Sequence, residues 1–339
     1  MTGRAASPMR SYAVAYLGFG NVGKALARLF ESRRRELAVR YGVSCRPTGI
    51  ASRALGWWAH PEGLTLTAPQ GSGTRCYDIA DWLLTARPDV VFESIALDPH
   101  TGQPALDYLA ETLRQGVHAV SANKGPLVHG YQRLNALAES HARLYRFEAA
   151  VMDGAPVFSL VRRCLPLAGM RSVHGIFTST ATVVIEAVER GATIDDGIRE
   201  AQSLGIAETD PSYDIDGWDS AVKLCAVSGV ILERAIRPAD VQRAGIRALD
   251  PDAVRAAHDA GRPFRLVGRV GVERDTITAR VAPEQVSVGS PLAVSGATLV
   301  THYDAEVFPQ GLTVTSAAPD LTTTAYGMFT DFLECIGAT

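Results

Sequence analysis

The chain has 339 residues, of which 47% are apolar and 20% are charged, and its formal net charge is −3. This length exceeds that of one ordinary domain, so we expect two domains, each with a core of its own. The small net charge gives no electrostatic reason to expect a nucleic acid or an anionic membrane as partner. A small polar molecule is the partner class that remains.

The ends and the cysteines of the chain predict a cytoplasmic protein. No apolar run reaches the roughly 18 to 20 residues that a membrane span needs, and the start MTGRAASPMRS lacks the apolar core of a signal peptide. We expect residues 1–11 to form a disordered tail. The five cysteines are far apart, odd in number and in no CxxC or Cys/His ligand spacing, so we expect reduced and mostly buried thiols.

Short apolar strands alternate with amphipathic helices through the first part of the chain, which is typical of a doubly wound parallel sheet with helices on both faces. Strands are expected near residues 12–17, 45–51, 89–95, 117–121 and 143–149. Helices are expected near residues 21–40, 79–86, 104–115 and 130–141. The predicted class is therefore α/β, with a Rossmann-type first domain over residues 12–150.

The pattern changes after Val151, where an α+β domain over residues 151–310 is expected. Its predicted elements are helices near 155–164, 181–190, 195–204 and 217–232, and a strand near 171–177. Residues 264–315 alternate apolar and polar side chains, as antiparallel strands with one solvated face do. Residues 320–336 form a predicted helix, and we expect the segment from about 311 to 339 to pack back on the first domain.

A glycine loop with the sequence GFGNVG joins the first strand to the first helix, which is the context that gives a GxGxxG pattern its meaning. Gly18 permits a tight turn, Gly20 lets backbone N–H groups approach a pyrophosphate, and Gly23 allows close packing of the helix. The assigned cofactor loop is Gly18, Phe19, Gly20, Asn21, Val22 and Gly23. The alternative is a glycine turn without a ligand.

The end of the second strand selects between the two nicotinamide dinucleotides. An acid there would hold the ribose diol, whereas an Arg would hold a 2′-phosphate. The strand ends GIASRAL, without an acid, and Arg53 suits a phosphate. We therefore predict NADP(H) in preference to NAD(H), the alternative for Arg53 being a solvated surface arginine.

Polar residues at the ends of later strands are assigned to the same cofactor site, since doubly wound sheets bind ligands at this edge. They are Ser94, Ser121, Asn123 and Lys124. In SANKGPL, Lys124 is expected near the nicotinamide, and Asn123 could fix it by hydrogen bonding. The alternative is an exposed loop lysine.

The segment AETDPSYDIDGWDSAVKLC gathers five acids ahead of one cation, Lys223. The acids are Glu208, Asp210, Asp214, Asp216 and Asp219. Asp219 and Lys223 are four residues apart on one predicted helical face, so the carboxylate can orient the ammonium as a proton donor. The remaining acids suit a substrate that carries an ammonium group.

Two other interpretations of this segment are a calcium loop and a charged, solvated cap. Ser212, Asp214, Asp216 and Gly217 fall at positions one, three, five and six of a calcium loop, but position twelve is Lys223 instead of a bidentate Glu. A helix that starts near Gly217 would also favour acids at its positive end.

Taken together, these segments resemble the homoserine dehydrogenase family. The resemblance covers residues from Tyr12 to Leu232 and rests on GFGNVG, TGQPAL, SANKGPL, FEAAVMDGAPV and AQSLGIAETDPSYDIDGWDSAVK, in the family's order. It implies that Lys223 and Lys124 serve proton transfer and that Asp219 is the partner of Lys223. It also implies that Glu208 and Asp214 hold the substrate ammonium.

The activity that this resemblance implies is NADPH-dependent reduction of L-aspartate 4-semialdehyde to L-homoserine, a step of threonine and methionine biosynthesis, with a lysine as proton donor. The chemistry requires no metal, but the family often binds a structural monovalent cation near the segment matching Glu148, Val151 and Asp153. The resemblance further implies a homodimer formed through the second domain. The chain resembles a short form of the family that has no regulatory domain, so feedback control is not expected.

Two segments depart from the family's pattern near the expected substrate. TSTATV keeps hydroxyl groups at Ser179 and Thr180, which we assign to substrate binding, but places Thr182 and Val183 where Asn or Ser and Tyr are usual. SAAPDLTTTAYG replaces a glycine-rich turn. These departures support an alternative hypothesis, in which the protein is a paralogue that reduces another amino or hydroxy semialdehyde. A catalytically silent dinucleotide sensor is an alternative of another class, against which the three residues Lys124, Asp219 and Lys223 argue.

Overall fold

The computed structural model describes residues 9–274 and 276–338, which form two compact units. Unit 1 contains the chain up to Gly154 and again from Asp320, and unit 2 contains Ala155–Pro319. The chain therefore enters unit 2 four residues after the predicted boundary at 150. It returns at 320 instead of 311, because residues up to Ser316 form a strand of unit 2. Residues 1–8 of the predicted tail lie outside the described part, whereas Arg10 and Ser11, also assigned to the tail, begin a strand.

Unit 1 is a seven-stranded sheet with helices on both faces. Its strands are β1 (Arg10–Leu17), β2 (Val43–Ser52), β3 (Gly56–Ala59), β4 (Thr74–Cys76), β5 (Val90–Glu93), β6 (His118–Ser121) and β7 (Tyr145–Arg146). Its helices are α1 (Asn21–Glu36), α2 (Ile79–Ala86), α3 (Ala105–Arg114), α4 (Lys124–Ser140) and α10 (Leu321–Cys335). The strand order is β4-β3-β2-β1-β5-β6-β7, in which the five strands from β2 to β7 are parallel and β3 and β4 are antiparallel additions at one edge. The doubly wound sheet was predicted, but this antiparallel edge was not.

Side chains of β1 alternate between two apolar layers. Val14 and Tyr16 point to the layer that α1 and α10 cover, and Ala15 and Leu17 point to the layer that contains Trp82 of α2. Alternation follows from the two-residue repeat of a strand. Because both faces are buried, β1 is almost continuously apolar, as is typical of a central parallel strand.

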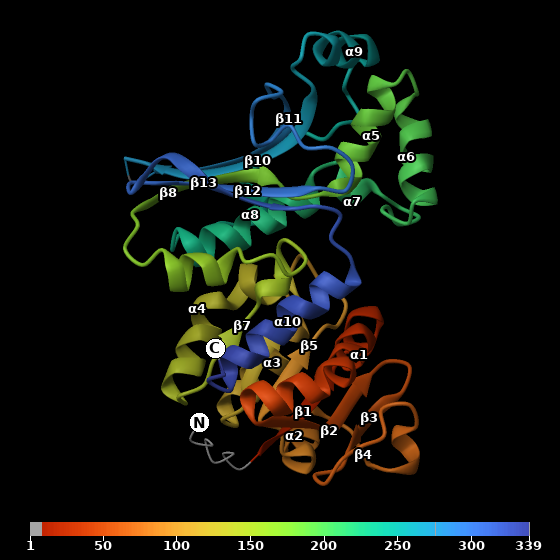
Figure 1. Cartoon of the computed structure of the whole chain (residues 1–339), viewed down its shortest axis with the longest axis vertical. Helices are drawn as coiled ribbons and strands as arrows, with labels where there is room; N and C mark the ends of the chain where they lie inside the picture. The colour runs from red at the N-terminus through yellow and green to blue at the C-terminus, as the bar shows by residue number, and fades with distance from the viewer. Residues whose placement is uncertain (1–8, 275, 339) are drawn as a thin grey trace, which may run out of the picture. The chain divides into compact units, whose positions relative to one another are not determined.

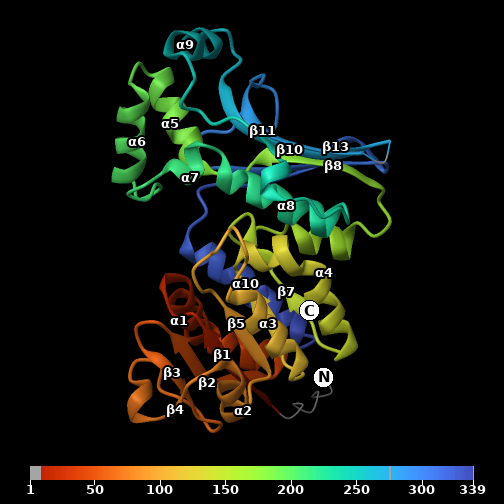
Figure 2. The same ribbon diagram turned by 180° about the vertical axis from the view of Figure 1, so that it is seen from behind.

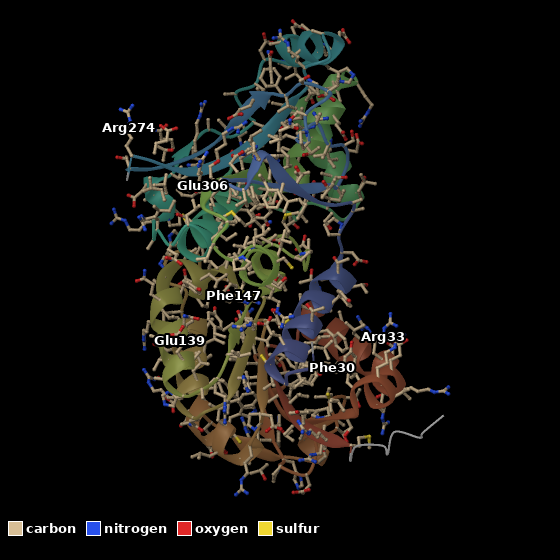
Figure 3. The ribbon with its side chains drawn as sticks, turned by 60° about the vertical axis from the view of Figure 1, so that its left-hand side comes forward. Phe30, Arg33, Glu139, Phe147, Arg274 and Glu306 are labelled. Carbon is tan, nitrogen blue, oxygen red and sulfur yellow. The ribbon has the colours of Figure 1, made fainter. Side chains whose placement is uncertain are left out.

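The C-terminal helix α10 lies beside α1 in unit 1 (Figures 1 and 2). Phe30 of α1 lies with its ring centroid 5.2 Å from that of Phe329 and 5.1 Å from that of Phe332. Figure 3 shows Phe30 on the side of α1 that faces α10, whereas Arg33 points away from it. The last helix is thus part of the core of unit 1 although it follows the whole of unit 2 in the sequence.

Helix α4 and strand β7 differ most from their predicted bounds, for identifiable reasons. Helix α4 begins at Lys124 instead of residue 130, because Asn123 caps it by accepting the N–H of Gly125 at 3.0 Å. Pro126 in its first turn lacks an N–H that would have no partner in the helix anyway. Strand β7 has two residues instead of seven, since the chain turns into a 3-10 helix at Glu148–Ala150.

Unit 2 is a six-stranded sheet with helices. Its strands are β8 (Met170–Ile176), β9 (Gln242–Arg243), β10 (Phe264–Glu273), β11 (Thr276–Gln285), β12 (Leu299–Ala305) and β13 (Phe308–Ser316). Its helices are α5 (Ser179–Glu189), α6 (Ile194–Ser203), α7 (Ser212–Ile215), α8 (Trp218–Ile231) and α9 (Pro251–Asp259). The order is β13-β12-β8-β10-β11-β9, and every pairing is antiparallel except that of β9 with β11.

Helix α8 lies along one face of this sheet (Figures 1 and 2). A side chain at Gly268 of β10 would come within 2.9 Å of the Phe177 ring and 3.2 Å of Leu224 of α8, so a glycine is needed for this close approach. The helix expected near 155–164 is shorter, with π-helical geometry over Leu160–Cys164. Among the helices that the structure describes, none is long and apolar enough to cross a membrane.

Candidate functional site

The three glycines of the GFGNVG loop have different surroundings. Gly18 has a φ of +96°, and a Cβ there would lie 2.6 Å from the carbonyl carbon of Ser94. A Cβ at Gly23 would lie 2.6 Å from the Gly18 carbonyl oxygen, whereas one at Gly20 would meet nothing within 4 Å. Gly18 and Gly23 therefore hold the loop between β1, β5 and α1. Gly20 presents open space to a ligand.

The other loop residues support this arrangement. Phe19 packs edge-on against Tyr16, with 5.5 Å between the ring centroids. Asn21 is the first residue of α1 and is exposed, and Val22 is half-buried. The Ser94 hydroxyl donates to the Gly18 carbonyl at 3.3 Å, so one predicted cofactor residue ties the end of β5 to the loop.

A cavity of about 450 Å³ opens beside this loop. Its lining includes Gly18, Phe19 and Gly20, the predicted discriminating residue Arg53, and three residues that sequence reasoning missed: Trp57, Pro104 and Tyr108. The rings of Trp57 and Tyr108 meet edge to face at 5.5 Å. Trp57 was missed because it lies on the unpredicted strand β3. The cavity and the open face of Gly20 fit a dinucleotide.

Arg53 follows β2 directly and is exposed at the rim of this cavity. Ser52, the last residue of β2, accepts the N–H of Leu55 at 3.0 Å through its hydroxyl and so turns the chain into β3. The strand-end pattern thus located residues at the rim of this cavity.

A buried acid, Glu93, ends β5 at the same edge of the sheet. Its carboxylate accepts the Ser121 hydroxyl at 2.5 Å, the Ile95 N–H at 2.9 Å and the Asn123 side-chain amide at 3.3 Å. Burial raises the pKa of Glu93, and these hydrogen bonds oppose that shift. Sequence reasoning missed Glu93, although an acid at the end of the apolar run VVFE was a visible signal.

This network determines where Lys124 begins its helix. Ser121 and Asn123, predicted to bind the cofactor, are both buried in it. Asn123 was expected to fix Lys124 by hydrogen bonding; its side-chain oxygen caps α4, in which half-buried Lys124 is the first residue. Through this cap, Asn123 sets where the helix that carries Lys124 begins.

In unit 2, Lys223 and Asp219 form a buried ion pair one turn apart on α8. The Nζ atom lies 2.8 Å from Asp219 Oδ2, and the two side chains are 10% and 12% exposed. Lys223 Nζ also donates to the Phe177 carbonyl at 2.5 Å, which places it beside the segment that leads into α5. The predicted four-residue spacing gives this pair.

Asp214 and Asp216 each have a separate partner, and Asp210 accepts the Ser212 N–H at 3.0 Å. Asp214 accepts the Thr180 hydroxyl at 2.6 Å, so two predicted substrate residues are joined. Asp216 pairs with Arg247 at 2.8 Å, and the same guanidinium donates to the Ser212 hydroxyl at 2.9 Å. This guanidinium lies where a calcium ion would need those oxygens. Glu208 is exposed.

The TSTATV segment forms the start of α5. Ser179 is its first residue and is half-buried, whereas Thr180 is 1% exposed. Thr182 and Val183, the positions that depart from the family's pattern, are 0% and 4% exposed. In the second departure, Ala318 adopts a φ of +45°, so it keeps a left-handed conformation that favours glycine.

The segment assigned to a monovalent cation lies in unit 1. Glu148 is buried in a 3-10 turn, and its N–H donates to Asp331 at 2.7 Å. Val151 is buried and Asp153 has a φ of +48°. The carboxylate and the carbonyl groups of this tight turn are oxygen donors, which suit a hard cation.

A dinucleotide site on a doubly wound sheet, with a second α+β unit that carries a buried lysine–aspartate pair, defines the chain as an NAD(P)-dependent oxidoreductase. Residues 156–333 match a family model described as homoserine dehydrogenase. Residues 18–148 match a model described as homoserine dehydrogenase, NAD binding domain. The chain belongs to the homoserine dehydrogenase family, which confirms the family prediction.

Relatives of the chain include an NAD(+)-dependent homoserine dehydrogenase of Pseudomonas canavaninivorans, 29% identical and covering 96% of each chain. The structure is similar to that of a putative homoserine dehydrogenase of Archaeoglobus fulgidus, with a TM-score of 0.83, 28% identity and coverage of 96% of this chain and 99% of that one. It shares its fold with a hyperthermophilic archaeal homoserine dehydrogenase solved in complex with NADPH, with a TM-score of 0.80, 24% identity and coverage of 97% and 99%.

Proposed function

We propose that the protein catalyses the NADPH-dependent reduction of L-aspartate 4-semialdehyde to L-homoserine. The observation that carries this proposal is the buried pair of Lys223 and Asp219, 2.8 Å apart. Removing two charges from water costs free energy, so a buried ion pair in this position calls for a functional reason. Acid catalysis at a carbonyl supplies that reason.

The nicotinamide ring, when bound, supplies the hydride that reduces the aldehyde carbon. The carbonyl oxygen gains negative charge as the hydride arrives, so a nearby ammonium stabilises the transition state more than the ground state. Lys223 gives its proton to that oxygen, and Asp219 keeps the ammonium charged and oriented. Lys124 is the second lysine that we assign to proton transfer.

Recognition of the amino acid part falls to Asp214 and Glu208, which pair with the substrate ammonium. Asp214 is held by Thr180, three residues after Phe177, whose carbonyl holds Lys223. The ammonium site and the proton donor are therefore linked through the start of α5. Ser179 and Thr180 supply hydroxyl groups at the same place.

We propose NADP(H) as the preferred cofactor, with Arg53 on the 2′-phosphate. Arg53 is exposed at the rim of the cavity beside the glycine loop, and the segment GIASRAL at the end of β2 contains no acid. Relatives of both kinds exist, since the Pseudomonas relative is named NAD(+)-dependent and the archaeal neighbour was solved with NADPH. The residue after β2 is therefore the feature on which this choice depends.

We also propose a monovalent cation at Glu148, Val151 and Asp153, held by oxygen atoms of that turn. Its effect would be to hold the turn against α10, where Glu148 already contacts Asp331. No proton transfer step requires it.

A homodimer through unit 2 is the assembly that we propose. Strand β13 spans nine residues at the edge of its sheet. Long edge strands leave backbone groups that another chain can pair with. Light scattering of the purified protein measures the mass of the assembly directly.

The proposed substrate is tested with a panel of aldehydes, by following NADPH consumption. We expect L-aspartate 4-semialdehyde to give the highest kcat/KM. Negligible turnover of it beside good turnover of another amino or hydroxy semialdehyde would establish the paralogue instead. Binding of NADPH without turnover of any member would indicate a dinucleotide sensor.

A further inference from the structure

Two histidines and an aspartate lie together on the second sheet. His302 of β12 pairs directly with His174 of β8, and Asp304 lies two residues further along β12. Directly paired residues, and residues two apart on one strand, point to the same face of a sheet. The register therefore brings three potential metal ligands to one place.

This place is separate from the substrate site. Gly175 pairs with Gly268, which faces Leu224 of α8. His174, the neighbour of Gly175, points to the opposite face because successive residues of a strand alternate. The cluster therefore lies on the face away from α8, which carries Lys223.

The distances between the three side chains fit a metal ion. His174 Nδ1 lies 3.3 Å from Asp304 Oδ2, and His302 Nε2 lies 3.5 Å from Asp304 Oδ1. Ligand atoms bound tetrahedrally at about 2.0–2.1 Å are about 3.3–3.4 Å from one another. The two separations, which run to the two oxygens of the Asp304 carboxylate, are close to this value. One ligand atom from each side chain can be chosen so that all three atoms lie within 4.8 Å of one another.

Second contacts orient two of the three side chains, His302 and Asp304. His302 Nδ1 lies 2.7 Å from the Thr313 hydroxyl, which leaves Nε2 as the atom directed to Asp304. The Ser172 hydroxyl donates to Asp304. Histidine ligands of metals characteristically have such a partner on their second ring nitrogen. A Cβ at Gly311 would collide with His302 Nε2, so a glycine is needed where β13 passes this imidazole.

We propose that His174, His302 and Asp304 form a binding site for a divalent transition-metal ion such as Zn²⁺. Two imidazoles and one carboxylate without a thiolate favour this class over Mg²⁺ and Ca²⁺. His174 and Asp304 also line a cavity of about 470 Å³, which can admit a water or small anion as fourth ligand. Arg269 lines the same cavity, but its charge is paired with Glu284 at 2.8 Å.

The site is tested by titrating the chelator-treated full chain with ZnCl₂ in a calorimeter. We expect one ion per chain in the wild type and more than about tenfold weaker binding in His174→Ala, His302→Ala and Asp304→Asn. Titration with CoCl₂ provides a second measurement, since tetrahedral Co²⁺ absorbs visible light strongly. Asp304→Asn keeps the shape of the side chain, so its loss of the cobalt band does not depend on a disturbed sheet.

Two further variants separate a built site from binding by surface histidines. Thr313→Val removes only the partner of His302 Nδ1, and we expect it to weaken Zn²⁺ by about 10- to 100-fold. His141→Ala removes an exposed histidine of unit 1 and should leave binding unchanged. Absence of a cobalt band in the wild type, or equal Zn²⁺ affinity in wild type and Asp304→Asn, would show a hydrogen-bonded cluster that holds no metal.

Discussion

Lys223 Nζ lies 2.8 Å from Asp219 Oδ2, one turn away on the buried face of α8, and also donates to the Phe177 carbonyl. If this ammonium protonates the substrate oxygen, Lys223→Ala should lower kcat by about 10²- to 10⁴-fold. The KM for NADPH should change little, because we assign the cofactor to the glycine loop and Lys223 to the substrate oxygen. Steady-state kinetics with both substrates varied measures the two effects separately.

Removal of Lys223 alone leaves Asp219 as a buried charge without its partner, which destabilises the fold by several kcal/mol. The control is therefore the double variant Lys223→Met with Asp219→Asn, which removes both charges and keeps both volumes. We expect near-normal unfolding by urea and the same loss of kcat. Turnover at the wild-type rate in this folded variant would exclude Lys223 as the proton donor.

The glycine loop offers two substitutions with opposite expected effects. Gly20→Ala adds a Cβ that meets no atom within 4 Å, so we expect little change in the free energy of unfolding. The added methyl group occupies the space in front of the loop, so the KM for NADPH should rise more than tenfold. Gly18→Ala combines a φ of +96° with a contact of 2.6 Å to Ser94, and it should lower the free energy of unfolding by about 1–3 kcal/mol. Equal cofactor KM in Gly20→Ala and wild type would contradict the assigned pyrophosphate position.

Local patterns predicted those features whose residues are close in sequence. Helix α2 has its predicted bounds because Asp78 caps it by accepting the Asp81 N–H and a regular apolar face follows. The pair of Asp219 and Lys223 follows from a spacing of four residues on a helix.

Features that depend on the register of distant strands were not predictable in this way. The bond between Thr180 and Asp214 joins residues 34 positions apart. The pairing of His174 with His302 arises only when β8 and β12 become neighbours in the sheet. Strand β3 has four residues, too few for a clear alternation, and the cavity residue Trp57 was missed with it.

Arg53 should control the choice between the two dinucleotides. Loss of a charged hydrogen bond of about 1.5–3 kcal/mol corresponds to about 10- to 100-fold in affinity. We therefore expect Arg53→Ala to raise the KM for NADPH by that factor and that for NADH by less than threefold. Arg53→Lys, which keeps the charge, should retain part of the preference. Equal effects of Arg53→Ala on both cofactors would show that Arg53 does not contact the 2′-phosphate.

Thr180 should position Asp214 for the substrate ammonium. Thr180→Val keeps the shape and removes the hydroxyl that Asp214 accepts at 2.6 Å. We expect the KM for the aldehyde to rise about tenfold, with the KM for NADPH unchanged. Thr182→Val is the matched control, since the Thr182 hydroxyl is buried without a hydrogen-bond partner in the described structure. The two variants should differ in their KM for the aldehyde. Identical values would show that Thr180 does not contribute to substrate binding.

His118 should make the fold less stable in acid. Burial and the nearby Arg143 lower the pKa of His118 from 6.5 to about 4, and its Nδ1 accepts the Leu144 N–H at 3.0 Å. An unfolded chain binds the proton near pH 6.5, so the contribution of His118 to stability is present above that pH and is lost as the pH falls through about 4. The full shift corresponds to about 3 kcal/mol, and we expect roughly half of it because the half-buried ring is partly screened by water.

His118→Asn keeps an acceptor for the Leu144 N–H but does not titrate, so its free energy of unfolding should fall less between pH 6.5 and pH 4 than that of the wild type. Urea unfolding at a series of pH values measures both slopes. His141→Asn, at an exposed position of the same unit, should follow the wild-type curve. If the free energy of unfolding of the wild type and of His118→Asn changed equally with pH, other groups would cause the acid sensitivity. His118 would then bind protons equally well in the folded and the unfolded chain and would contribute no pH dependence.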